Sequence, residues 1–371
     1  MTEPSGPPRV SVVLPAFNAE PFVAAAVDSI LGQTLSDLEL IVVDDGSTDG
    51  TPAILADRAA HDRRVRILGR RHRGVVHALN DGLREARADY VAIMNADDVS
   101  LPERLERQAA FLDAHPTVAA VGGQSCLMLA DGTRGAVTSL PLEPAALRAI
   151  MMQAAPLANP TVMLRRDAVL EIGGYRPQFA SAAEDYDLWL RLSERLELAN
   201  LSDVVLLYRL HAGQLTGQAS EGVAIATLVA RAAARARRAG LPDPVAGLTT
   251  IDRELAEKLG IPAAEIARLA IENALSRGEC LATVAAPAAA CRGPLEALRG
   301  HAAAAREPGL FVGADRWLRA RLLAREGRWA RALPLFAGAA AADGAFRRRL
   351  VGAVRRRVAG RWWPARGLPA C

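Results

Sequence analysis

The chain has 371 residues, 51% hydrophobic and 4% aromatic, so it is too apolar for a disordered protein and too long for one typical core; we expect two domains. Its net charge of +4 is unevenly distributed along the chain. Residues 1–220 carry 20 Arg and 28 Asp or Glu, whereas residues 221–371 carry 25 Lys or Arg and 13 Asp or Glu. The apolar runs are short, no secretory signal is visible, and the four cysteines lack metal or redox spacing. We therefore expect a cytoplasmic protein without a transmembrane helix.

Short apolar runs alternate with helical patterns along the first part of the chain. The expected strands are residues 10–14, 38–43, 65–68 and 90–94, and the expected helices are residues 22–31, a segment starting at residue 51, and residues 74–87. This alternation predicts an α/β fold with a doubly wound, mostly parallel sheet. An amphipathic helix is expected at residues 101–112, and further strands are expected at residues 118–128 and 161–164.

Two adjacent carboxylates, Asp97 and Asp98, follow the apolar run of residues 90–94. Open α/β sheets bind ligands at the carboxyl ends of their strands, and two neighbouring negative charges are costly without a cation. A divalent metal that carries a phosphate-bearing substrate would satisfy them. The alternative is that both residues cap the helix that starts near Pro102.

A second acidic pair, Asp44 and Asp45, ends the run of residues 38–43. A carboxylate at a strand end can accept hydrogen bonds from ribose hydroxyls or from a base N–H group. The alternative is that Ser47 or Asp49 caps the next helix, and both interpretations can hold together. The chain has no G-x-G-x-x-G after its first strand and no G-x-x-x-x-G-K-[ST], which argues against a dinucleotide oxidoreductase and a P-loop enzyme.

An ordered set of motifs over about residues 8–216 together resembles the family 2 inverting glycosyltransferases, which have the GT-A fold. The motifs are Val10–Asn18, Ser29–Thr34, Glu39–Asp49, Asn95–Asp98, Gly173–Tyr175, Ala183–Arg191 and Tyr208–His211. The resemblance implies a GT-A domain at residues 1–220, followed by a smaller all-α domain at residues 221–371.

Carried over by position, the resemblance implies a site for a nucleotide-sugar donor. Pro15 and Phe17 would line the nucleotide pocket. Asp45 would bind a uracil-type base with Asp44 beside it, and Asp97 would lie near the ribose.

The same resemblance implies a metal and a catalytic base. Asp98 corresponds to the metal-binding carboxylate, and His211 to a late histidine that joins the metal or the diphosphate. Many family members have Asp where this chain has Asn95, which leaves the metal geometry open. Asp185 corresponds to the catalytic base; the alternatives are an acidic first turn of a helix for Asp185 and an ordinary surface residue for His211.

Glycosyl transfer from a nucleotide sugar needs these two functions at separate places. A divalent cation such as Mg²⁺ or Mn²⁺ neutralises the leaving diphosphate, and a free carboxylate or histidine takes the proton of the acceptor hydroxyl. Glu184 and Asp185 supply an acidic site far from Asp97 in the sequence. Burial beside Tyr186 would raise the pKa of Asp185, whereas Trp189 is expected to be core packing.

Ala and Arg dominate residues 221–371, where helical spacing predicts a helical accessory domain interrupted at residues 240–244. Residues 318–341 faintly resemble one tetratricopeptide-like helical hairpin. The basic end, with arginines from Arg347 onward and the pair Trp362 and Trp363, suits an anionic membrane surface; the alternative is a solvated tail. No nucleic-acid motif accompanies it.

We therefore expect an inverting glycosyltransferase of the hexosyl or N-acetylhexosaminyl type, which takes its sugar from a UDP-linked donor in bacterial cell-surface glycan synthesis. The acceptor would be a glycan or a lipid-linked molecule, reached from the cytoplasm or at the inner face of the plasma membrane. One rival is a non-catalytic protein that binds sugar nucleotides. Another is a nucleotidyltransferase, but Pro15–Asn18 stands where its Gly-rich phosphate loop would be.

Overall fold

The computed structural model describes residues 6–129, 131–180, 182–211, 221–283, 316–321, 323 and 329–342. The chain forms two compact units, one of residues 1–211 with 225–260 and one of residues 212–224 with 261–371. Residues 225–260 therefore group with the first unit, and the predicted functional division at residue 220 stays a prediction.

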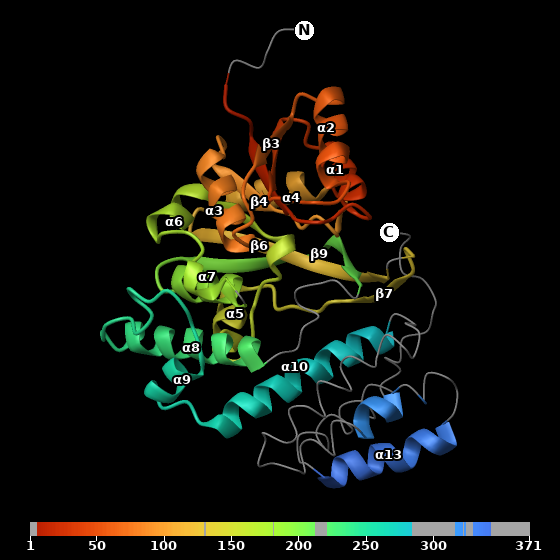
Figure 1. The fold of residues 1–371 in the computed structure, drawn as a ribbon, viewed down its shortest axis with the longest axis vertical. Coiled ribbons are helices and arrows are strands. Elements are labelled where there is room, and N and C mark those ends of the chain that lie inside the picture. The colour runs from red at the N-terminus through yellow and green to blue at the C-terminus, as the bar shows by residue number, and fades with distance from the viewer. Residues whose placement is uncertain are drawn as a thin grey trace. The chain divides into compact units, whose positions relative to one another are not determined.

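Four parallel strands form the first half of one sheet, in the spatial order β3-β2-β1-β4 (Figure 1). They are β1 (Val10–Ala16), β2 (Leu38–Asp44), β3 (Val65–Gly69) and β4 (Tyr90–Ile93). The helices between them are α1 (Val23–Leu31), α2 (Thr51–His61) and α3 (Val75–Glu85). The predicted doubly wound α/β architecture is thereby confirmed.

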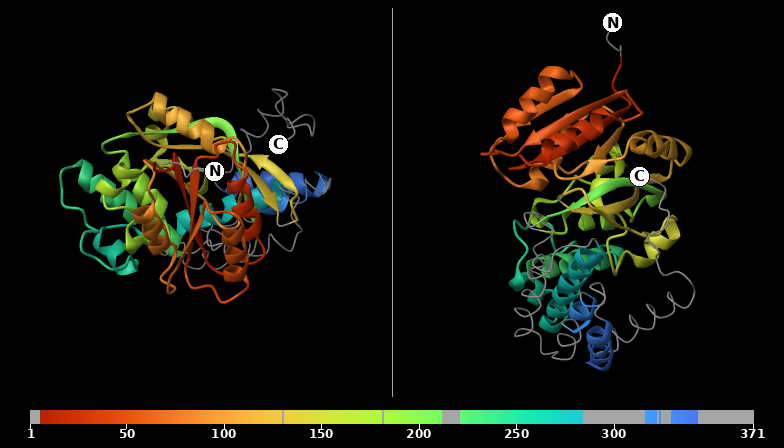
Figure 2. Two further views of the ribbon diagram at one scale, coloured as in Figure 1. Left: turned by 90° about the horizontal axis from the view of Figure 1, so that it is seen from above. Right: turned by 90° about the vertical axis from the view of Figure 1, so that its right-hand side faces the viewer.

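The helices cover both faces of these strands (Figure 2). On one face, α1 and α4 (Arg104–Ala114) pack apolar side chains such as Val27 and Leu105 into the main core. On the other face α3 lies so close to β1 that a Cβ atom on Gly82 would be 2.4 Å from Cγ1 of Val13. Glycine at this position therefore lets the helix approach the strand.

The second half of the sheet is mixed, in the order β4-β8-β6-β9-β5, with β7 paired to β6. Strand β8 runs antiparallel to β4 and β6, whereas β9 runs parallel to β6. These strands are β5 (Val99–Ser100), β6 (Val118–Leu129), β7 (Arg134–Val137), β8 (Met163–Arg165) and β9 (Glu197–Leu210). The predicted strands near residues 118–128 and 161–164 are present, and β9 is a long strand that was not predicted.

Short helices connect these strands, and α7 is the one that carries Asp185. They are α5 (Pro144–Ile150), α6 (Arg166–Glu171), α7 (Glu184–Leu192) and the 3-10 turns η1 (Asn159–Thr161) and η2 (Pro177–Phe179). Trp189 of α7 is fully buried, as its expected role in core packing requires.

The later part of the described chain is helical, as predicted. Its helices are α8 (Glu221–Arg238), α9 (Arg253–Lys258), α10 (Ala263–Thr283) and α13 (Trp329–Ala342), with the predicted break after α8. The basic end from Arg347 lies outside the described residues. No helix within the described ranges has the length and apolarity needed to cross a bilayer.

A buried carboxylate joins the strands at the edge of the sheet where they begin. Glu39 of β2 is 2% exposed and accepts hydrogen bonds from the Ser11 hydroxyl (2.7 Å), Nη1 of Arg66 (2.7 Å) and the backbone N–H of Arg87 (2.9 Å). Although burial opposes it, these donors and the Arg87 charge lower the pKa of Glu39. The stabilisation is therefore present above the unfolded-state pKa and is lost as the pH falls through the folded-state pKa.

We expect Glu39→Ala to lower the free energy of unfolding by about 2 kcal/mol, because it leaves buried donors unpaired while the two arginine side chains can still reach water. Urea denaturation at neutral pH measures this change. The control is Glu103→Ala, which removes an exposed partner of Arg107 and should cost less than about 0.5 kcal/mol. Equal effects of the two substitutions would contradict this account of Glu39.

Candidate active site

The predicted nucleotide-binding residues lie together at the carboxyl edge of the sheet. The register pairs Pro15 with Val43 and Ala16 with Asp44, and the N–H of Asp45 donates to the carbonyl of Ala16 (2.9 Å). Parallel pairing of β1 and β2 thus places the residues that follow each strand next to each other.

Asp45 organises a cluster of contacts that includes one residue missed by the sequence analysis. Its carboxylate, 4% exposed as a residue, accepts the N–H groups of Arg73 (2.9 Å) and Gly74 (2.8 Å). Nδ1 of His72 lies 2.9 Å from Oδ2 of Asp45, and the His72 ring stacks on Phe17 with centroids 4.0 Å apart. The Phe17 ring is 44% exposed, so a flat aromatic surface lies beside a buried carboxylate.

The neighbouring acidic residues have structural contacts. Oδ1 of Asp44 accepts the N–H of Ser47 (3.0 Å), and Oδ1 of Asp49 accepts the N–H of Thr51 (3.0 Å) at the start of α2. Asp49 therefore binds the first N–H of α2 from outside the helix, whereas the N-cap position itself is Gly50 and has no side-chain cap.

The carboxylate of Asp98 faces the protein. Asp98 has 0% exposure, its Oδ1 accepts the backbone N–H of Arg209 (2.8 Å), and its Oδ2 accepts Nδ2 of Asn95 (3.1 Å). Burial and the charge of Asp97 raise the pKa of Asp98 well above its usual value. Asn95 is thus explained locally, because an Asp there would set a second carboxylate against Asp98.

Asp97 instead faces His211. Its Oδ2 lies 2.9 Å from Nε2 of His211, the two side chains are 23% and 18% exposed, and the carbonyl of Asp97 accepts Nε of Arg209 (2.7 Å). The His211 ring also lies 4.6 Å from that of Phe22 at the start of α1. Since Phe17 contacts His72 and Phe22 contacts His211, the β1–α1 connection borders both the Asp45 and the Asp97 clusters.

These residues fit a cation that is shared with a substrate. No group of three or more His, Cys, Asp or Glu side chains that could hold a metal occurs in the part of the chain that the structure describes. Mg²⁺ bound with phosphates needs only one or two protein carboxylates, and a partly exposed Asp97–His211 pair supplies two donor atoms. Asp98 fits less well, because both of its oxygens already accept protein hydrogen bonds.

Asp185 lies in the first turn of α7, where its Oδ1 accepts the N–H of Tyr186 (2.6 Å). Burial raises the pKa of Asp185 to about 6, in the predicted direction, and burial with the Asp185 charge raises the pKa of Glu184 to about 8. With a pKa of about 6, Asp185 is mostly ionised at neutral pH and is a stronger base than a carboxylate of ordinary pKa, whereas Glu184 is mostly protonated there.

Helix α3 connects the Asp45 cluster with the turn that precedes α7 at Tyr175. It begins after Gly74, whose N–H binds Asp45, and its Asn80 makes two hydrogen bonds to the backbone of Tyr175 (2.7 and 2.9 Å). The buried Tyr175 phenol lies near enough to Asp185 that this charge, second to burial, raises the pKa of the phenol. Asn80 and His72 escaped the sequence analysis; the only signal for His72 is its position after the third predicted strand.

Comparisons with known proteins show which family this chain resembles. The family model described as "Glycosyl transferase family 2" matches residues 11–172. The O-antigen biosynthesis glycosyltransferase WbnJ of Escherichia coli is 32% identical over 209 residues, which are 54% of this chain and 80% of WbnJ.

Two solved structures share the fold. The mannosyltransferase PcManGT of Pyrobaculum calidifontis, in complex with GDP-Man and Mn²⁺, has a TM-score of 0.50 and 22% identity over 92% of this chain and 88% of its own. Residues 1–349 of S. aureus TarS, in complex with UDP-GlcNAc, have a TM-score of 0.50 and 18% identity over 85% of this chain and 89% of their own. At these identities the likeness concerns the fold alone.

We expect Asp98→Ala to lower the free energy of unfolding by about 2–3 kcal/mol, because it leaves the buried N–H of Arg209 without an acceptor. The matched substitution Asp97→Ala, at a partly exposed carboxylate, should cost less than about 1 kcal/mol. Urea denaturation of both variants measures the difference. A larger loss for Asp97→Ala than for Asp98→Ala would contradict the assignment of Asp98 to the interior.

Proposed function

Because the chain belongs to glycosyl transferase family 2, we propose that this glycosyltransferase moves a sugar from a nucleoside diphosphate to an acceptor hydroxyl with inversion at the anomeric carbon. The observation that carries the proposal is the separation of two acidic sites: the Asp97–His211 pair at the sheet edge and Asp185 on α7. Each suits one of the two tasks of the reaction.

The donor would bind at the carboxyl edge of the sheet. The Phe17 and His72 rings offer a stacking surface for a base. The Asp45 carboxylate holds the His72 ring in place and would accept a base N–H only through the lone pairs that Arg73, Gly74 and His72 leave free. Pro15 and Asp44, at the ends of β1 and β2, would support this stacking surface. We propose a UDP-linked donor; the fold neighbours PcManGT and TarS are bound to GDP-Man and UDP-GlcNAc, respectively.

Asp97 and His211 would hold Mg²⁺ or Mn²⁺ together with the donor diphosphate. When bound, the cation neutralises the charge that develops on the leaving diphosphate. We propose this role for Asp97 and a supporting role for Asp98. The expectation from the sequence was the reverse, with Asp98 at the metal and Asp97 near the ribose. The contacts support the reversal, because Asp98 fixes β9 and so sets His211 opposite Asp97.

Asp185 would take the proton of the acceptor hydroxyl as that oxygen attacks the anomeric carbon. One displacement of this kind inverts the anomeric centre and needs no enzyme nucleophile. The acceptor would be a glycan or a lipid-linked glycan, and the setting bacterial cell-surface polysaccharide synthesis, as the name of WbnJ suggests. The rival proposal, a non-catalytic binding protein, predicts donor binding without turnover.

We expect Asp97→Ala to weaken Mn²⁺-dependent donor binding by roughly 10–100-fold, because the cation loses a charged ligand. Calorimetric titration with UDP-GlcNAc and with GDP-Man, each with and without Mn²⁺, measures the effect. Asp167→Ala, at an exposed carboxylate on α6, is the control. Unchanged Mn²⁺-dependent affinity in Asp97→Ala would remove Asp97 from the metal site.

We expect Asp185→Asn to keep donor affinity and to lower turnover by about 10²–10⁴-fold, the usual contribution of a general base. In the wild type the rate should fall as the pH drops through about 6, because protonation removes the base. Release of nucleoside diphosphate from donors in a panel, followed between pH 5 and 8, measures both effects. Glu184→Gln is the control; a larger loss for Glu184→Gln would assign the base to Glu184.

A further inference from the structure

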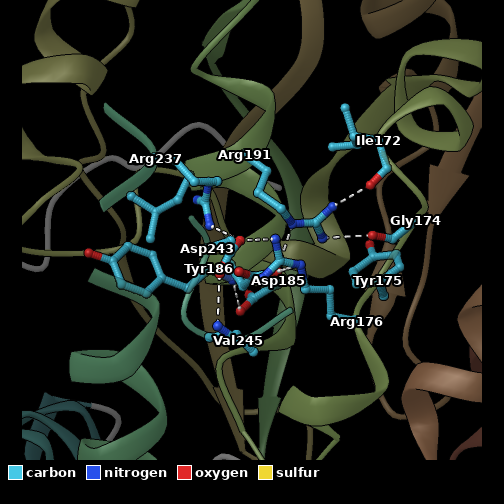
Figure 3. A network of polar contacts seen from close by, with 12 residues as sticks. Ile172, Gly174, Tyr175, Arg176, Asp185, Tyr186, Arg191, Arg237, Asp243 and Val245 are labelled. Atoms are coloured by element: carbon cyan, nitrogen blue, oxygen red, sulfur yellow. Dashed lines mark hydrogen bonds and ion pairs between the residues drawn. The ribbon is translucent and has the colours of Figure 1, made fainter. Parts of the chain in front are cut away.

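Six charged side chains form a network around α7 that the proposed reaction does not use (Figure 3). Three arginines face three carboxylates, and all six lie in the first compact unit. The members are Arg176, Arg191, Arg237, Asp187, Glu194 and Asp243. Asp243 and Arg237 lie in the segment after β9, well beyond residue 172, where the family match ends.

The network begins in the first turn of α7. Asp187 has 0% exposure, and its Oδ2 accepts Nε of Arg191 (2.8 Å) and lies 3.6 Å from Nε of Arg176. Arg191 also donates to the carbonyls of Ile172 (2.9 Å) and Gly174 (2.7 Å). The helix is thereby anchored to the turn that precedes Tyr175.

Two arginines at one buried carboxylate leave an excess positive charge, which Asp243 offsets. Its Oδ2 accepts Nη2 of Arg176 (2.5 Å) and Nη1 of Arg237 (2.8 Å), and its Oδ1 accepts the N–H of Val245 (3.0 Å). Burial alone would raise the pKa of Asp243, but these donors outweigh it and lower the pKa to about 2. Asp243 is therefore ionised throughout the working pH range.

The network returns to the far end of α7. Nε of Arg237 in α8 donates to Glu194 (2.9 Å), which lies just past the last residue of α7. A separate contact supports the same coupling, because Nε of Arg231 in α8 donates to the Tyr186 hydroxyl (3.0 Å), next in sequence to Asp185. The segment after β9 thus contacts α7 at both ends.

We propose that Asp243 is a positioning residue for glycosyl transfer: one of its oxygens binds both Arg176, which faces Asp187 in the first turn of α7, and Arg237, which binds Glu194 just after the last turn, and this fixes the turn that carries Asp185. This inference rests on the proposed role of Asp185 as the base. It adds that full activity requires a residue outside residues 11–172, the segment that the family model matches. Small displacements of a catalytic group lower the rate without weakening the binding of a donor held elsewhere.

The test is Asp243→Asn in the full chain, with Mn²⁺ and whichever of UDP-GlcNAc and GDP-Man the wild type hydrolyses. We expect kcat to fall by roughly 10–100-fold while KM for the donor stays unchanged. Asp243→Glu, which keeps the charge, should recover part of kcat. Asp252→Asn is the matched control, because Asp252 lies in the same segment but caps α9 through the N–H of Leu255.

Amide hydrogen exchange supplies a readout that does not depend on activity. In Asp243→Asn the amides of α7 should exchange faster, while those of β1 and β2 keep their wild-type rates. If Asp243→Asn fails to fold, Glu194→Gln, at the more exposed end of the network, should give a smaller change in the same direction.

Each result decides between the two proposals. Wild-type kcat with wild-type exchange in α7 overturns the role of Asp243, and so does a loss of donor affinity that matches the loss of kcat. If Asp185→Asn retains turnover, the proposed base is wrong. In that case, faster exchange in α7 of Asp243→Asn would still show that Asp243 stabilises the helix. A loss of kcat in Asp243→Asn would then arise from the displacement of another residue in the same turn.

Discussion

The candidate active site depends on one buried carboxylate, that of Asp98. A buried ionisable group must be compensated locally, and here one donor is the nearby Asn95 amide and the other is the backbone of β9, 111 residues away in the sequence. Satisfying Asp98 therefore brings the end of β9 to the end of β4. Arg209 and His211 arrive beside Asp97 as a result, and Asp97 remains the more exposed of the two acidic residues.

The rest of the site is held together in the same way: side chains bind backbone groups of segments that are distant in the sequence. Asp45 binds two N–H groups ahead of α3, and Asn80 of α3 binds both backbone groups of Tyr175. One helix thereby connects the Asp45 cluster with the turn at Tyr175. Rigid support of this kind suits a reaction in which donor and base must be held at fixed relative positions.

The sequence predicted the alternating elements well, because buried parallel strands are continuous apolar runs that end in polar residues. It could not decide between Asp97 and Asp98, since adjacent positions after a strand face opposite ways and the sequence does not say which way. His72 and Asp243 were missed for another reason. Each acts through a partner far away in the sequence, Phe17 and Arg176, and neither lies in a recognisable motif. The strand β9 was missed because polar residues such as Asn200 and Asp203 interrupt its apolar pattern.

Residues 225–260 belong to the same compact unit as the sheet, although the family match ends at residue 172. This predicts where a chimaeric protein could be joined without breaking the contacts of α7. A crossover placed near residue 220, where the composition changes, would separate α7 from Arg237 and Asp243, whereas a crossover after residue 260 would carry the whole network with the sheet. For this chain, an exchange of C-terminal helices keeps the contacts of α7 intact only when it is made downstream of residue 260.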